Sequence, residues 1–257
     1  MQLKRIALIL ALLMGGLYAS ELNVTTDVIV ENLTIESGDK MILSTGITLT
    51  VNGDVVITGE LEMADSSIVD AGGDVAVNGT LDMIGTARLK MEGDLTFGGT
   101  LEASAASRIE LDGLLTQTIS GTATPVFNRL FCSSSATVFN LTATINDTLD
   151  AGGEDFTISD SKTLTMVSGS VTVISGGSWT RTGTLTLNAD SKVLYDTGAN
   201  STMTPEAYGH IEHNGGTLSQ DGALTVAGTF TNTSGNFIAS EDITASGIVW
   251  TAGSVTG

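Results

Sequence analysis

The acidic residues of this chain recur at a fixed spacing that would bring carboxylates together. Three similar blocks begin at Gly53, Gly73 and Gly93, which are equally spaced along the chain. Two sets of acidic residues repeat at the same interval: Asp54, Asp74 and Asp94 in one, and Glu62, Asp82 and Glu102 in the other. If the chain stacks with this period, each set forms a column with a spacing of about 4.8 Å. Calcium binds clustered carboxylate oxygens, so all six residues are candidate calcium ligands.

A solvated acidic face is the simpler interpretation of these columns. Like charges about 4.8 Å apart repel by only about 0.9 kcal/mol in water, so the columns need no ligand. The calcium-binding repeat GGxGxDxUx is also absent, as the segment AGGDVAVNG from Ala71 shows. We therefore predict no resident cofactor and keep calcium as the alternative.

The two histidines of the chain, His210 and His213, lie three positions apart. Zinc ligands four positions apart share a face of a helix, as in the H-E-x-x-H motif. On a strand, however, side chains alternate between opposite faces. We expect a strand here, so the two rings should point in opposite directions, and the sequence predicts no zinc site.

A polysaccharide-cleaving enzyme would need carboxylates clustered with arginine or lysine. Arg88 and Arg108 lie one repeat apart beside acidic positions and come nearest to this arrangement, but ion pairing along the stack explains them more simply. No G-x-S-x-G, P-loop or dinucleotide-binding signature is present. We predict no catalytic residues, and a secreted polysaccharide-active lyase or hydrolase remains the alternative.

Residues 1–19 have the pattern of a secretory signal peptide. Lys4 and Arg5 precede an apolar run from Ile6 to Leu17, and small residues follow near Ala19. The run is shorter than the ~20 residues that a membrane-spanning helix needs. The sequence therefore predicts a protein that is secreted or held at the cell surface, with no transmembrane segment after signal removal.

Charge and cysteine content narrow the possible partners and stabilising bonds. Without the leader, the chain has eight Lys and Arg residues against 29 Asp and Glu residues, a formal net charge of −21. This acidity repels phosphate backbones, so we predict no nucleic-acid partner. The single cysteine, Cys132, excludes an internal disulfide framework. We expect it to be buried, as free cysteines usually are.

The elements that position these residues must repeat with the same period. Apolar residues alternate within each block, which indicates strands: Val55, Ile57, Leu61 and Met63; Val75, Val77, Leu81 and Met83; and Leu95, Phe97, Leu101 and Ala103. Glycines separate the two apolar pairs of each block, at Gly59, Gly79 and Gly99, where we expect a corner. A second alternating segment follows in each block, marked by Val69 and Ala71, by Leu89 and Met91, and by Ile109 and Leu111.

Short strands and corners that recur at a fixed period are typical of a solenoid, in which each coil buries its inward residues against its neighbours. The sequence predicts an all-β fold, a right-handed parallel β-helix with coils of about 20 residues over residues 20–257. In this register Asp70, Lys90 and Glu110 stack with alternating signs, which supports the prediction. A barrel or sandwich would need antiparallel hairpins with their own turn dipeptides. The last twelve residues keep the repeat without a polar cap, so we expect a fragment of a longer protein.

The repeats resemble the β-helical repeat segments of large bacterial secreted surface proteins, including autotransporter passengers and filamentous haemagglutinin-like adhesins. The phrases that carry the resemblance are TQTISGTATPVFNRL from Thr116, DAGGEDFTISDSKTLTM from Asp150, GGSWTRTGTLTL from Gly176 and DGALTVAGTFTNTSGNF from Asp221. The resemblance implies an extracellular structural or adhesive segment, non-catalytic, whose partners are cell-surface glycans, host or matrix proteins, or further copies of itself. A third interpretation is an ice- or mineral-binding face built from threonine ladders, such as Thr48 with Thr50 or Thr184 with Thr186.

Overall fold

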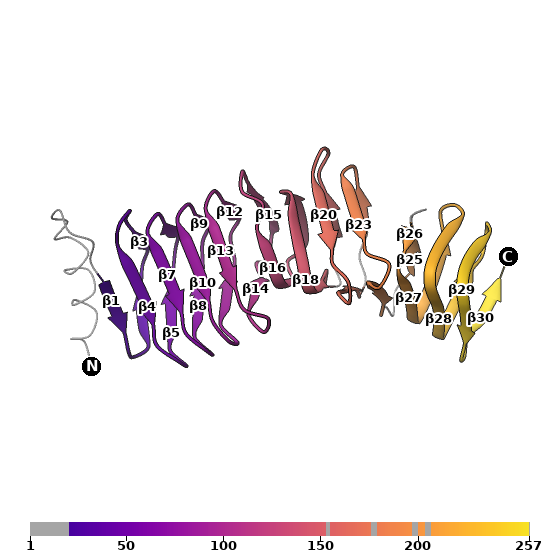
Figure 1. Ribbon diagram of the computed structural model, residues 1–257, viewed down its shortest axis with the longest axis horizontal. Helices are drawn as coiled ribbons and strands as arrows, with labels where there is room; N and C mark the ends of the chain where they lie inside the picture. The colour runs from indigo at the N-terminus through magenta and orange to yellow at the C-terminus, as the bar shows by residue number, and fades with distance from the viewer. Residues whose placement is uncertain (1–20, 153–154, 176–178, 197–199, 204–206, 257) are drawn as a thin grey trace.

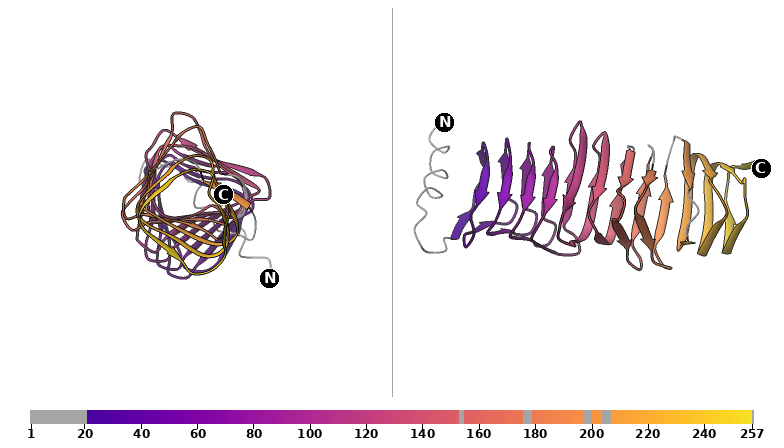
Figure 2. Two further views of the ribbon diagram at one scale, coloured as in Figure 1. Left: turned by 90° about the vertical axis from the view of Figure 1, so that its right-hand side faces the viewer. Right: turned by 90° about the horizontal axis from the view of Figure 1, so that it is seen from above.

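The computed structural model describes residues 21–152, 155–175, 179–196, 200–203 and 207–256, apart from the side chains of residues 179–181 and 200. The predicted signal peptide, residues 1–19, lies outside these ranges. The chain winds into an elongated rod, with β1 and β30 at opposite ends (Figure 1). Seen from one end, the coils lie over one another (Figure 2). Within the described ranges, no helix is long and apolar enough to cross a membrane.

Three parallel sheets run along the rod. Sheet A consists of β1 (Glu21–Val24), β4 (Lys40–Leu43), β7 (Glu60–Met63), β10 (Thr80–Met83) and β13 (Thr100–Ala103). Sheet C consists of β3 (Leu33–Ile35), β6 (Val55–Ile57), β9 (Val75–Val77), β12 (Leu95–Phe97), β15 (Thr116–Gly121), β17 (Ala136–Asn140), β19 (Asp155–Ile158) and β22 (Trp179–Arg181).

Sheet B extends along the whole described length. Its strands are β2 (Val28–Val30), β5 (Thr48–Val51), β8 (Ile68–Ala71), β11 (Arg88–Met91), β14 (Arg108–Leu111), β16 (Val126–Cys132), β18 (Ala143–Asp150), β20 (Thr163–Met166), β21 (Val171–Ile174), β23 (Thr184–Leu187), β24 (Lys192–Tyr195), β25 (Asn200–Met203), β26 (Ala207–Tyr208), β27 (His210–Gln220), β28 (Leu224–Ile238), β29 (Ile243–Trp250) and β30 (Ser254–Thr256). The longest of these, β27 and β28, pair with more than one strand of a neighbouring coil.

The sequence repeat sets the register between coils. Leu61, Leu81 and Leu101 are successive Cα partners in sheet A, and Val55, Val75 and Leu95 are successive partners in sheet C. Residues at alternate positions are buried, so each coil presents the same inward columns to the next. The structure therefore confirms an all-β parallel solenoid with coils of about 20 residues.

Glycines occupy the corners between sheets C and A because adjacent coils approach too closely there for a side chain. A Cβ atom at Gly79 would lie 2.0 Å from the Gly59 carbonyl oxygen, and one at Gly99 would lie 2.0 Å from the Gly79 carbonyl oxygen. The predicted corners are thus confirmed. The reason is steric exclusion between coils, and neither glycine has a positive φ.

Sheet A ends at β13, and the regular stack is interrupted there. Within the described residues, no register pairing joins β13 to β16, although the two strands lie close together. Asn128 bridges the break, because its Nδ2 atom donates to the carbonyl oxygens of Ala103 at 2.5 Å and Ser104 at 2.7 Å. Leu101 and Ala103, which the sequence predicts to be core residues, are consequently only half-buried.

The core changes in composition along the rod. From β12 onward the core contains stacked phenylalanines, with ring centroids 5.6 Å apart for Phe97 and Phe127 and 6.5 Å apart for Phe127 and Phe139. Buried apolar residues form two clusters, one from Val24 to Met166 and one from Ile174 to Phe237. Thr172 lies between them, facing inward, and its hydroxyl has no hydrogen-bond partner.

Candidate functional site

The first acidic column lies at the corner between sheets B and C and bonds to the backbone of the next coil. Asp54 Oδ1 accepts the Asp74 N–H at 3.0 Å, and Asp74 Oδ1 accepts the Asp94 N–H at 2.8 Å. Asp94 Oδ1 in turn accepts the Thr118 N–H at 2.7 Å. At the start of the column, Asn32 Oδ1 accepts the Asp54 N–H at 2.9 Å. Each carboxylate therefore accepts a hydrogen bond from a backbone amide of the following coil.

The second acidic column points outward from sheet A. Glu62, Asp82 and Glu102 are successive Cα partners, as the repeat predicts. Lys40 neutralises one end, because its Nζ atom lies 2.7 Å from both Glu60 Oε1 and Glu62 Oε2. Partial burial, followed by the charges of Glu102 and Glu62, raises the pKa of Asp82. At the centre of this column the protonated form of Asp82 is therefore favoured relative to that of an exposed carboxyl group.

Neither column is assembled into a metal centre in the described part of the chain. There, no group of three or more His, Cys, Asp or Glu side chains is placed to hold a metal ion. The calcium interpretation of the six column residues gains no support and stays a prediction.

The densest group of cations lies on the outer face of sheet B. Arg88, Arg108 and Arg129 are successive Cα partners on β11, β14 and β16, and we call them the arginine column. Glu110 holds Arg88 in a bidentate pair, with Nε to Oε1 at 3.0 Å and Nη2 to Oε2 at 2.8 Å. The same carboxylate also contacts Arg108 Nε. One acid thus orients two guanidinium groups, which are about one-third exposed (33% for each side chain).

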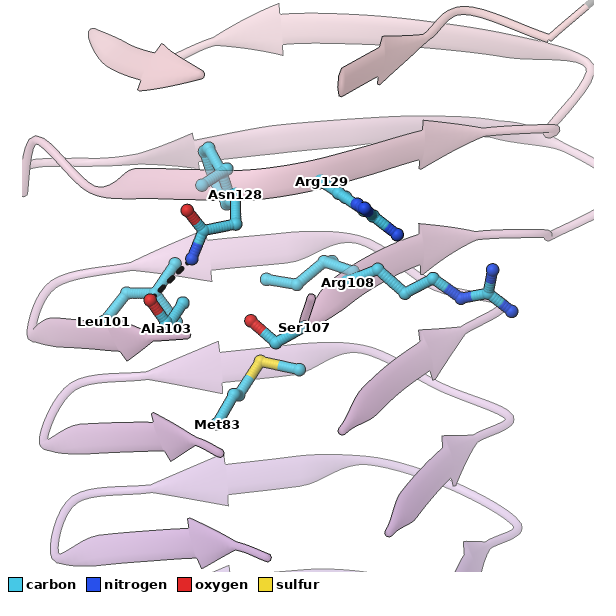
Figure 3. Close-up of a pocket in the computed structure, with 9 residues that line it drawn as sticks. Met83, Leu101, Ala103, Ser107, Arg108, Asn128 and Arg129 are labelled. Carbon is cyan, nitrogen blue, oxygen red and sulfur yellow. Dashed lines mark hydrogen bonds between the residues drawn. The ribbon is translucent and has the colours of Figure 1, made fainter. Parts of the chain in front are cut away.

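Further contacts hold the arginine column in place. Arg129 Nε lies 2.5 Å from Asp147 Oδ2, and the Arg108 guanidinium lies over the Phe131 ring at 5.4 Å from its centroid. Figure 3 shows Arg108 and Arg129 next to each other beside the recess at the sheet A break, which Met83, Leu101 and Asn128 also line. The column therefore lies beside the irregular part of the rod.

Alternating charges flank the arginine column on the same face. Lys90 is the Cα partner of both Asp70 and Glu110, as predicted. Its Nζ atom lies 3.5 Å from Asp70 Oδ1 and 3.0 Å from Asp112 Oδ2, whereas Glu110 turns to the arginines. The hydrogen bond to Asp112 raises the pKa of Lys90.

No protein-family model, curated protein or solved structure matches this chain.

The two histidines lie on opposite sides of β27, as predicted. His210 is half-buried, and its Nδ1 accepts the Thr229 N–H at 3.1 Å. His213 is fully buried, with Nδ1 2.5 Å from Asn232 Oδ1 and Nε2 2.5 Å from the Gly215 carbonyl oxygen. Both rings are therefore engaged with neighbouring backbone and side-chain groups and do not converge.

The threonine candidates differ from one another. Thr48 has Ile68 as its Cα partner and Thr50 has Asp70, so neither begins a ladder. By contrast, the pairs Thr163–Thr184, Thr144–Thr165 and Thr165–Thr186 are all in register on β18, β20 and β23. A hydroxyl array therefore exists on one part of the rod, over three strands.

Cys132 is buried, as predicted, and burial raises the pKa of its thiol to about 12. A thiol in this environment is protonated and unreactive at neutral pH.

Sequence reasoning missed Arg129, Phe131 and Asp147 as members of the sheet B cluster. The fixed repeat interval leads from Arg88 to Arg108, whereas Arg129 lies one residue beyond the next position that it predicts, because the coil between them has a longer corner after β14 and no sheet A strand. The alternation of Arg129 and Phe131 with buried Leu130 and Cys132 is the signal that could have placed them on the outer face.

Proposed function

We propose that this chain is an extracellular or cell-surface β-solenoid segment, structural and adhesive in role, that displays a binding surface and performs no catalysis. The leader-like residues 1–19 support export, and the resemblance to bacterial adhesin repeats supports a surface location. A right-handed winding is part of the proposal, since right-handed crossovers dominate among parallel strand connections.

The observation that carries this proposal is the segregation of charge among the outer faces of the rod. Sheet A displays the acidic column of Glu62, Asp82 and Glu102, while sheet B displays the mixed cluster around the arginine column. The strands β3, β6, β9, β12, β15 and β17 of sheet C contain no charged residue. A rigid rod whose faces differ in chemistry is suited to presenting one face to a partner.

The direct test uses purified residues 20–257 against a glycan array and against immobilised collagen and fibronectin. We expect saturable binding to at least one of these probes, with no release of oligosaccharides from bound polysaccharide. Cleavage products would favour the secreted lyase or hydrolase, and a complete lack of binding would contradict the adhesive role.

A second candidate function rests on the threonine ladder of β18, β20 and β23. Hydroxyl groups there repeat at the strand spacing of about 4.8 Å, as an ice- or mineral-binding surface requires. If this candidate is correct, the protein should depress the freezing point of water below its melting point. Thr165 lies at the centre of the ladder, so Thr165→Lys should abolish the difference between the freezing and melting points.

A further inference from the structure

We propose that the arginine column binds a linear acidic polysaccharide, with anionic groups on successive sugars held by Arg88, Arg108 and Arg129. This inference rests on the proposed adhesive function, and it names the ligand class and the face that takes it.

The geometry of the column suits a repeating anion. Its three residues are Cα partners in adjacent parallel strands, so their backbones are about 4.8 Å apart. A guanidinium group has five N–H donors in a fixed fork. Within the described residues, Arg129 donates to Asp147 through Nε and the nearest contact of Arg108 with Glu110 is also made by Nε, and neither residue forms a hydrogen bond through its terminal nitrogens.

The surrounding acids orient the column without covering it. Glu110 is only 13% exposed, accepts two hydrogen bonds from Arg88 and contacts Arg108 Nε, while Asp147 accepts a hydrogen bond from Arg129 Nε. Guanidinium groups whose positions are fixed before binding lose less entropy when they hold a carboxylate or sulfate.

Stability of the fold does not require arginine at these positions. The same outward column continues to Ile68 on one side and to Thr148 on the other. Three aligned cations repel one another, and two of them share a single carboxylate. The chain has eight cations outside its leader, and three of them lie in this one column, where a single anionic chain can contact all of them.

Phe131 adds an apolar surface to the same face. It is half-buried on β16, one alternate position from Arg129, and packs under the Arg108 guanidinium. The ring therefore supports the Arg108 guanidinium through a cation–π contact and helps to fix its position.

The acidic residues around the arginine column favour a polyanion with widely spaced charges over one with closely spaced charges. Duplex DNA carries one charge per about 1.7 Å of axis, and its phosphates would extend over the acidic neighbours of the column. A polysaccharide with one carboxylate per sugar carries its charges farther apart than duplex DNA does, so separate carboxylates can reach arginines on separate coils. It can therefore meet the arginines while avoiding Asp70 and Asp112.

The test measures binding of residues 20–257 to polygalacturonate by isothermal titration calorimetry. We expect binding that weakens with added salt and is lost with the fully methyl-esterified polymer. Arg129→Gln should weaken binding about tenfold, the loss expected for one charge-assisted contact. Arg129→Lys keeps the positive charge but lacks the forked N–H donors of the guanidinium group, so it should recover only part of the lost affinity.

Lys192→Gln is the matched control. Lys192 lies farther along the same face, is 39% exposed against 40% for Arg129, and pairs with Glu212 at 3.0 Å. Both substitutions remove one positive charge and leave one partly exposed acid. We expect Lys192→Gln to bind within twofold of the original chain, and an unchanged thermal unfolding midpoint of both variants excludes misfolding.

Several results would overturn the inference. Equal losses of polygalacturonate affinity in Arg129→Gln and Lys192→Gln would show that binding depends only on net charge. Equal binding of the esterified polymer, tighter binding of duplex DNA, or no polygalacturonate binding would each reject it. If the original chain binds collagen, fibronectin or a neutral arrayed glycan but not polygalacturonate, the inference fails while the adhesive function stands. If the original chain binds none of the probes, the adhesive function fails as well.

Discussion

Asp82 shows how a single outward residue is affected by the stacking of coils. Its carboxylate lies between Glu62 and Glu102, and burial together with these charges raises its pKa. Because the folded-state pKa is raised, ionisation of Asp82 favours unfolding. The protonated carboxyl group of Asp82 contributes stability that is fully present below the unfolded-state pKa of about 3.9. This contribution is lost as the pH rises through the pKa of the folded state.

Asp82→Asn should therefore stabilise the protein at neutral pH. We expect a gain of up to about 1 kcal/mol at pH 7, the scale of a like-charge pair across adjacent strands. The gain should disappear near pH 3, where the original carboxyl is protonated. Urea unfolding at both pH values measures the effect, and an equal gain at pH 3 would show that it does not come from charge.

Asp74 illustrates a residue whose role is a hydrogen bond to the next coil. Asp74→Ala removes the acceptor of the Asp94 N–H and should destabilise the fold by about 1 kcal/mol. Asp74→Asn keeps an acceptor oxygen and should cost less than half as much. If the two variants are equally destabilised in urea unfolding, the carboxylate acts through its charge and not through this bond.

The residue roles were only partly predictable from the sequence. The repeat interval placed the members of both acidic columns in register, because strand pairing preserves sequence spacing when all coils have equal length. It could not reveal that Asp54, Asp74 and Asp94 bond to the backbone, since this depends on the corner geometry. Arg129 was missed because the coil that separates it from Arg108 is one residue longer than the repeat interval.

At the scale of elements, the corners constrain the strands that they connect. Gly98 and Gly99 are neighbours at one corner but differ in their surroundings. A Cβ atom at Gly99 would lie 2.0 Å from the Gly79 carbonyl oxygen, which is fixed backbone. One at Gly98 would lie 2.9 Å from Asn78 Oδ1, the end of a side chain that can move.

Gly99→Ala should therefore destabilise the protein by about 3 kcal/mol, the upper range for overpacking, whereas Gly98→Ala should cost about 1 kcal/mol or less. Thermal unfolding of the two variants provides the comparison. Equal midpoints for both would mean that the coils separate easily at this corner.

Sheet A shows where element prediction from the repeat fails. Alternation correctly identifies β13 as a strand, with Leu101 and Ala103 on its inward side. It cannot predict that the next coil does not pair with β13, because that depends on the route from β15 to β16. The inward residues of β13 therefore lose part of their cover, and Asn128 replaces part of the missing backbone pairing.

At the scale of the whole molecule, the division of the core into two clusters should be visible in unfolding. Coils contact only their neighbours, so a solenoid loses cooperativity where one interface is weak. Thr172 marks such a weak interface. Its Cα partners are Leu149 and Val193, and its buried hydroxyl has no hydrogen-bond partner. We expect the regions on either side to unfold at different urea concentrations.

Thr172→Val should strengthen this interface. The substitution keeps the shape of the side chain and removes an unpaired buried hydroxyl, so we expect a gain of about 1–2 kcal/mol. It should also bring the two unfolding transitions closer together, measured by urea titration with hydrogen exchange as a local probe. A loss of stability would indicate that the hydroxyl is solvated in the folded protein.

The parallel pairing between coils also determines how the rod responds to mechanical force. Hydrogen bonds between successive strands run along the long axis, so tension applied at the two ends loads one coil at a time (Figure 2). Each coil that detaches removes about 4.8 Å of rod and releases about 70 Å of extended chain. Under load, the molecule would lengthen in discrete steps, absorbing work at each step while the remaining coils keep their surface intact.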